Sequence, residues 1–168
     1  MSINALADFV RPLYQDLDGV NRFDAIERIG RIARTLHPPT RELELLILFS
    51  GLVKWLDKPR NLSRTLLTRH VAEGELRNTI AALHRLDAPE TGAECAVAAA
   101  MLIDSAGVRG LAERFAHARR EGLSIEDVAR EEPPQVPQWM DARARTLMIE
   151  RIAEREKFAR ALLDEARR

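Results

Sequence analysis

The sequence predicts an all-α protein that folds as a single compact multi-helix bundle. Its 168 residues are rich in Ala, Leu, Arg and Glu, which favour helices, and poor in β-branched and aromatic residues, which favour strands. Apolar residues recur at spacings of three and four, and no stretch keeps the alternation typical of a strand. Hydrophobic residues make up 46% of the chain, enough to fill one core. We therefore expect one domain over residues 1–168.

The N-terminal part predicts two amphipathic helices. The apolar face of the first helix comprises Ile3, Leu6, Val10 and Leu13. Pro12 should kink or interrupt this helix. A turn is expected at Asp18-Gly19. The second helix ends at His37-Pro38-Pro39, and its apolar stripe comprises Phe23, Ile26, Ile29, Ala33 and Leu36.

The middle of the chain predicts helices of a buried core. The segment LELLILFSGLV, after Thr40, is apolar nearly all the way round and predicts one central helix. Two further helices are expected at residues 62–71 and 75–86. The Ala-rich run from Ala93 to Ile103 predicts a closely packed helix, in which the single cysteine, Cys95, should be buried.

Glycines and prolines divide the C-terminal part. Gly107 and Gly110 come before a helix that is expected to reach about Arg120 and to end at Gly122. Ser124 and Asp127 predict the capping box of a short helix. After a proline-rich loop, a long last helix is expected at about 139–167, with an apolar stripe made of Leu147, Met148, Ile152, Phe158, Leu162 and Leu163.

The charge balance argues against binding to nucleic acid or to a membrane surface. Lys plus Arg number 26, as do Asp plus Glu, so no net charge attracts a polyanion. The best basic patch, Arg114, Arg119 and Arg120, lacks interleaved aromatic residues for base stacking. No run approaches the roughly 20 apolar residues that span a bilayer, and the N-terminus lacks the basic start of a secretion signal. We expect a cytoplasmic protein.

Four segments, in this order, resemble the HD-domain superfamily of metal-dependent phosphohydrolases, and more narrowly its small stand-alone bacterial members. They are NRFDAIERIGRIA (21–33), LFSGLVKWLDK (48–58), AAMLIDSAGVRGLAERF (99–115) and ARTLMIERIAEREKFARALLDE (144–165). Their order and spacing carry the likeness, together with the placement of Gly107 and Gly110. The resemblance covers nearly the whole chain and implies an HD-domain-like helical bundle.

The resemblance also implies four metal-ligand positions, which this chain has vacated. The family's His, His-Asp pair and later Asp fall on Ala25, Val53, Lys54 and Met101. A rival register would make Asp104 the ligand, but the two glycines argue against it. Ala25, Val53 and Met101 offer no donor suited to a hard divalent ion, and Lys54 would repel one. The resemblance therefore implies that the metal, any cofactor and metal-dependent hydrolysis are lost.

The former metal cavity is expected to be packed with apolar side chains, including Val53 and Met101. Two arrangements of Lys54 remain open. In the first, its ammonium is buried and paired with Asp104 or Asp57, because an isolated buried charge is costly. In the second, Lys54 reaches solvent beside Trp55.

Three functions follow from these observations. The first is a catalytically inactive binding, regulatory or structural module, acting as a homodimer or with a protein partner. The second is an active phosphohydrolase with a rearranged site, which requires Asp57, His84 and Asp104 to converge on an open pocket. For His84 itself, an ordinary position at the end of a helix is favoured over a role in a cleft. The third is a sensor for a nucleotide or phosphate, bound by Arg28, Lys54 and Arg109. Glu27 is a further candidate cleft residue, although a position on the solvent-exposed face of its helix is favoured.

Overall fold

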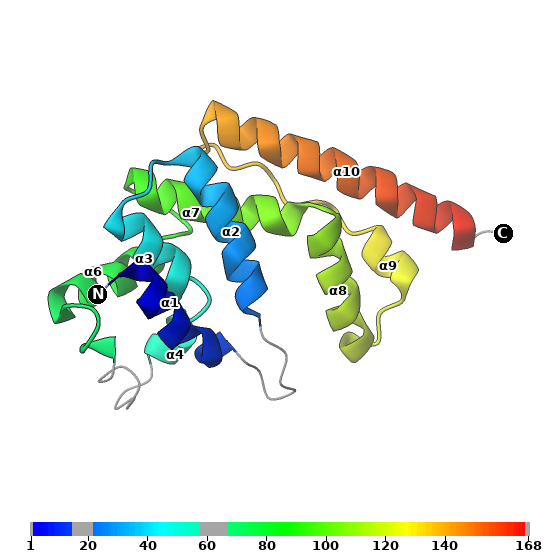
Figure 1. Ribbon diagram of the computed structural model, residues 1–168. Helices are drawn as coiled ribbons and strands as arrows, with labels where there is room; N and C mark the ends of the chain where they lie inside the picture. The colour runs from blue at the N-terminus through cyan, green and yellow to red at the C-terminus, as the bar shows by residue number, and fades with distance from the viewer. Residues whose placement is uncertain (1, 15–21, 58–66, 167–168) are drawn as a thin grey trace. The chain divides into compact units, whose positions relative to one another are not determined.

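The computed structural model describes residues 2–14, 22–57 and 67–166, except for the side chains of residues 119 and 120. All regular secondary structure within these ranges is helical, which confirms the all-α prediction (Figure 1). The chain divides into two compact units, Met1–Ala98 and Ala99–Arg168, and each is described by itself. The expectation of one domain stays a prediction.

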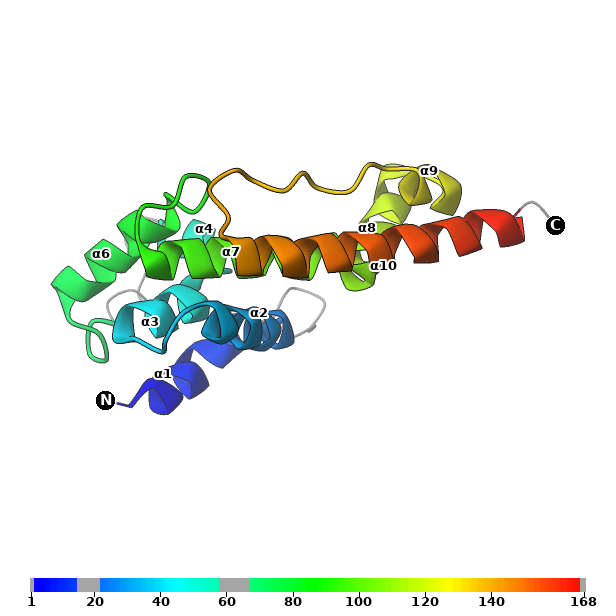
Figure 2. The ribbon, with the colours of Figure 1, turned by 90° about the horizontal axis from the view of Figure 1, so that it is seen from above.

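Short helices build the first unit. They are α1 (Ile3–Val10), the 3-10 helix η1 (Arg11–Tyr14), α2 (Phe23–Leu36), α3 (Arg41–Phe49), α4 (Val53–Leu56) and α6 (Glu73–Leu83). Helix α3 contacts α1, α2 and α6, and is the central helix of this unit (Figure 2). Six of its nine residues are buried, in agreement with the apolar pattern: Leu43, Leu45, Leu46, Ile47, Leu48 and Phe49.

The two N-terminal helices form largely as the sequence predicts. Helix α1 ends at Val10, and the chain continues through Pro12 as the 3-10 helix η1. Proline cannot donate the backbone hydrogen bond that would continue the α-helix. In α2 the predicted stripe is buried except for its last residue, Leu36. The predicted turn at Asp18-Gly19 lies outside the described residues, as does the first half, residues 62–66, of the helix expected at 62–71.

The expectation of one helix through LELLILFSGLV is wrong. The chain breaks between α3 and α4, at Ser50–Leu52, where the ring of Tyr14 approaches the backbone. A Cβ atom at Gly51 would lie 2.6 Å from Tyr14 Cε1. The Tyr14 hydroxyl donates a hydrogen bond of 2.6 Å to the Leu48 carbonyl, which satisfies an acceptor at the end of α3. Burial raises the pKa of this hydroxyl, despite a backbone hydrogen bond at Gly51.

Helix α7 (Gly92–Ala106) begins in the first unit and continues into the second, which also contains α8 (Val108–Glu121), α9 (Ile125–Ala129) and α10 (Ala142–Ala166). Within this unit α8, α9 and α10 contact one another. Their shared core is made of Leu111, Ala118, Val128, Ala129 and Ala159, with Phe115 and Leu163 at its edge. In α7, Cys95 is half-buried rather than buried.

The ends of the second unit's helices follow local signals. Gly122 has φ of +74° and ends α8, as expected. The Ser124–Asp127 capping box forms in full. The last helix begins at Ala142, later than expected, because the Asp141 carboxylate accepts the Ala144 backbone N–H at 2.8 Å and caps the helix there.

The apolar stripe predicted for α10 holds only in part. Met148 is fully buried, whereas Phe158 is 41% exposed. In the part of the chain that the structure describes, no single helix is long and apolar enough to cross a membrane. Taken together, α7 and α8 are long and apolar enough, although the pair is bent. The core helix of a soluble protein also meets these criteria of length and composition.

Candidate functional site

The four positions where the family resemblance would place metal ligands are not part of a fully buried core. Ala25 lies on α2 and Val53 on α4, and both are half-buried. Met101 is half-buried on the part of α7 that belongs to the second unit. Val53 and Met101 thus keep part of their surface in solvent, and the expectation that apolar side chains fill the former metal cavity stays a prediction.

Lys54 is exposed. The expectation of a buried, paired ammonium is therefore wrong, and the alternative, in which Lys54 reaches solvent, is observed. Helix α4 is only four residues long and begins at Val53. One of the acids suggested as its partner, Asp57, instead accepts a hydrogen bond from His84. An ammonium that reaches water needs no buried counter-ion, which agrees with the ordinary solvation of a lysine on a short surface helix.

Two predicted site residues, Asp57 and His84, do come together. His84 Nε2 lies 3.0 Å from Asp57 Oδ1, with side chains 51% and 44% exposed. Asp57 follows α4 and His84 follows α6, and these two helices contact each other. The helix-end position favoured for His84 is thus observed. The third member of the rearranged site, Asp104, is half-buried on α7 in the second unit.

The predicted anion contacts do not form one cluster within either unit. Arg28 is half-buried on α2, and Lys54 is exposed on α4. Arg109 belongs to the second unit, where its exposed guanidinium lies 3.8 Å from Glu113 one helical turn later. Glu27 is engaged by Arg11 at 3.2 Å. Across residues 2–14, 22–57 and 67–166, no three His, Cys, Asp or Glu side chains gather as metal ligands would.

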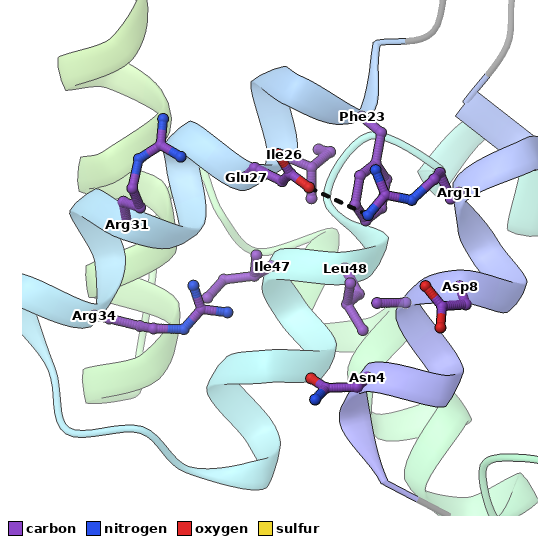
Figure 3. Close-up of a pocket in the computed structure, with 11 residues that line it drawn as sticks. Asn4, Asp8, Arg11, Phe23, Ile26, Glu27, Arg31, Arg34, Ile47 and Leu48 are labelled. Carbon is purple, nitrogen blue, oxygen red and sulfur yellow. Dashed lines mark hydrogen bonds and ion pairs between the residues drawn. The ribbon is translucent and has the colours of Figure 1, made fainter.

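The sequence did not indicate a pocket of about 410 Å³ between α1, α2 and α3, here called the α1–α3 pocket (Figure 3). Three arginines line it: Arg11, Arg31 and Arg34. Its apolar wall comprises Phe23, Ile26, Ile47 and Leu48. A volume of this size falls within the range of small-molecule sites, about 300–1,000 Å³.

Two of these three arginines already have partners. Arg11 lies over the Phe23 ring, 4.3 Å from its centroid, and pairs with Glu27. Arg34 donates two hydrogen bonds to Glu44, at 2.7 and 2.6 Å, which raise the pKa of its guanidinium despite partial burial. Arg31 is exposed and has no ion pair with any described residue. Sequence periodicity places Arg31 and Arg34 on the polar side of α2, but it cannot show that this side and Arg11 of η1 border one pocket.

No family model matches the chain, and no curated protein matches it significantly. Its fold is similar to that of Bacillus subtilis YpgQ in two solved structures. The complex of YpgQ with ADP has a TM-score of 0.68 at 17% identity, over 98% of this chain and 97% of that chain. A second crystal structure of YpgQ has a TM-score of 0.67 at 18% identity, with the same coverage. At this level of identity, the likeness shows that the two proteins share a fold.

Proposed function

We propose that this chain is a binding or regulatory module built on the HD-domain frame, and that it does not carry out the metal-dependent hydrolysis of that family. The observation that carries the proposal is the chemistry of the four vacated positions. Hydrolysis by such enzymes needs a divalent ion held by imidazole or carboxylate ligands. The side chains of Ala25 and Val53 have no lone pair to give, the Met101 thioether is a soft donor unsuited to a hard ion, and the Lys54 ammonium carries a positive charge into solvent.

Metal content is the direct test of this proposal. We expect the protein, purified without chelator, to carry less than about a tenth of an equivalent of any transition metal, because family-type binding depends on well-placed ligands. A full equivalent of Mn, Fe, Ni or Zn would overturn the proposal. Phosphomonoester and nucleotide hydrolysis should stay at the level of a buffer blank with each of these metals added.

A gain-of-binding variant tests the assignment of the positions themselves. The triple substitution Ala25→His, Val53→His and Lys54→Asp places three family-type ligands within the first unit. Three protein ligands are sufficient for many metal sites. We expect this variant to bind a divalent ion, whereas Lys54→Asp alone should not. If the triple variant folds and binds no metal, the residues assigned to the lost site are wrong.

A nucleotide is the first ligand to test, because a solved protein of the same fold holds ADP. Saturation at about 100 times the dissociation constant stabilises a protein by about 2.7 kcal/mol. For a chain of this size, that gain raises Tm by about 5–10 °C. The absence of any shift with millimolar ADP, AMP or ATP would remove nucleotides as ligands and leave the loss of hydrolysis untouched.

The pairing of Asp57 with His84 favours a second candidate, a metal-free hydrolase. A histidine held by a carboxylate is a suitable general base. Against this candidate, both side chains are about half exposed, and neither lines the α1–α3 pocket. A phosphatase activity that His84→Gln and Asp57→Asn both abolish would establish this function in place of the first.

A further inference from the structure

The outward face of α10 carries a regular line of charges, here called the α10 stripe. Its members are Arg143, Glu150, Lys157 and Asp164, which follow one another at intervals of seven residues, alternate in sign and are all exposed. Because residues seven apart lie almost on one line along a helix, the four side chains point the same way from one unbroken helix (Figure 1). The opposite side of α10 holds its buried residues, Ala144, Met148, Arg155 and Ala159.

The charges of the α10 stripe are not used within the molecule. None of its four side chains makes an ion pair or a hydrogen bond with a residue that the structure describes. Other charges of the same helix do pair: Arg151 with Glu154 at 2.8 Å, and Arg160 with Glu156 at 3.5 Å. Neighbours in the stripe cannot reach one another, because seven residues rise about 10 Å along a helix. The alternation of sign therefore has no counterpart inside one copy of the chain.

The order of charges makes the α10 stripe complementary to itself in one arrangement. An antiparallel copy, centred midway along the stripe, brings Arg143 level with Asp164 and Glu150 level with Lys157, and symmetry repeats both contacts. A parallel copy in register opposes every charge with its like. Displacing the antiparallel copy by one heptad also opposes like charges: Glu150 meets itself and Arg143 meets Lys157 in one direction, and Lys157 meets itself and Glu150 meets Asp164 in the other. The stripe thus favours one orientation and one register.

The residues around the stripe suit the close approach of a second helix. Thr146, Ala153 and Ala161 lie between its charges, are exposed and have small side chains, which let two helix backbones come near each other. Ile149, 52% exposed, and Phe158 lie on the two sides of the same face. Contact with a second helix would remove part of their apolar surface from water.

We propose that the α10 stripe is the interface of a homodimer, in which α10 of one copy packs antiparallel on α10 of a second copy. A contact with two-fold symmetry presents the same surface from both copies, as a self-complementary stripe requires. Exposed ion pairs are individually weak, so the charges set the register while the apolar flanks add buried area. This interface lies wholly within the second unit and goes beyond the proposed loss of hydrolysis, which does not depend on it.

A charge exchange tests the pairing. The dissociation constant of the dimer is measured by sedimentation equilibrium of the full chain at low ionic strength, where charges are screened least. Glu150→Lys should weaken the dimer by at least about tenfold, because it opposes two cations at both symmetric contacts. Adding Lys157→Glu should restore the wild-type constant. The matched control is Glu132→Lys, which changes the net charge equally at an exposed acid in the loop after α9, and it should leave the constant unchanged.

Disulfide cross-linking tests the orientation, in a Cys95→Ala background that removes the one native thiol. Ala153→Cys, near the centre of the antiparallel contact, should link two copies. Thr146→Cys, on the same face, should not, because about 22 Å of helix separates it from its own copy and a disulfide needs Cα atoms within about 7 Å. A protein that stays monomeric at millimolar concentration overturns the proposal. So does a dimer that Glu150→Lys leaves intact, that the charge exchange does not restore, or that cross-links equally well at both positions or at neither.

Discussion

The Glu94 carboxylate lies in the first turn of α7, within the first unit. It is fully buried and accepts hydrogen bonds from Arg85 Nη2 at 2.6 Å and from the backbone N–H groups of Glu90 and Thr91 at 2.7 and 3.4 Å. In return, Thr91 Oγ1 accepts the Glu94 N–H at 3.2 Å, which completes a capping box for α7. Replacing Glu94 by Gln keeps the size of the side chain and removes its charge.

The cost of this replacement can be worked from the contacts. Removing one partner of a buried ion pair costs about 3–5 kcal/mol, because the other charge is left uncompensated. Arg85 is 39% exposed and also lies 3.3 Å from Glu90, so solvent and a second acid compensate it in part. The amide of Gln still accepts one hydrogen bond. We therefore expect Glu94→Gln to lower the free energy of unfolding by about 2–3 kcal/mol.

Urea denaturation followed by circular dichroism at pH 7 measures this change. The matched control is Glu90→Gln, which removes a carboxylate that contacts the same arginine but is 69% exposed. It should cost less than about 1 kcal/mol, as exposed ion pairs do. The reasoning is refuted if both variants lose the same free energy of unfolding, or if Glu94→Gln loses less than about 1 kcal/mol. Either result would mean that the buried Glu94 carboxylate does not stabilise the fold through its ion pair.

The same carboxylate predicts how stability depends on pH. Burial alone would raise the pKa of Glu94, but the Glu90 N–H and the Arg85 guanidinium outweigh it and hold this pKa below its ordinary value. A carboxyl group of this kind stabilises the fold above its unfolded pKa, about 4.3, and the gain is lost as the pH falls through the lower folded pKa. The wild-type protein should therefore lose more stability than Glu94→Gln on acidification below about pH 4.

Three further substitutions test a buried hydrogen bond, a close approach of the backbone and a left-handed glycine, each by urea denaturation or thermal melting. Tyr14→Phe removes a buried hydrogen bond to the backbone and should cost about 1–2 kcal/mol. Gly110→Ala would place a Cβ atom 1.8 Å from the Ser105 carbonyl oxygen, so we expect a loss of about 3 kcal/mol or failure to fold. Gly122→Ala forces alanine to a φ of +74° and should cost about 1 kcal/mol. Gly74→Ala is the control, because it meets nothing within 4 Å and should be neutral or stabilising.

Local sequence signals predicted the helices well where neighbouring residues alone decide the structure. The stripe of α2 and the capping box at Ser124 each depend on residues within one or two turns. The capping box at Thr91 and Glu94 has the same signature and could have been found in the sequence. The break after α3 could not, because it depends on the Tyr14 ring reaching Gly51, 37 positions further along the chain.

The candidate sites were harder to predict for a similar reason. Sequence can show that a position lacks a metal ligand, and Ala25, Val53 and Met101 lack one whatever the fold. It cannot show whether a lysine reaches water, and the exposure of Lys54 removes the need for a buried partner. Nor can it show which arginines pair with which acids, since these pairs join residues far apart in the chain, such as Arg114 with Glu131.

Its volume alone does not make the α1–α3 pocket an anion site. Arg11 and Arg34 have carboxylate partners there, and Arg31 is exposed to water. An anion entering that pocket would compete with Glu27 and Glu44 or with solvent. An anion gains most where it replaces neither a carboxylate nor bulk water, so the three arginines of the α1–α3 pocket do not by themselves predict an anion there.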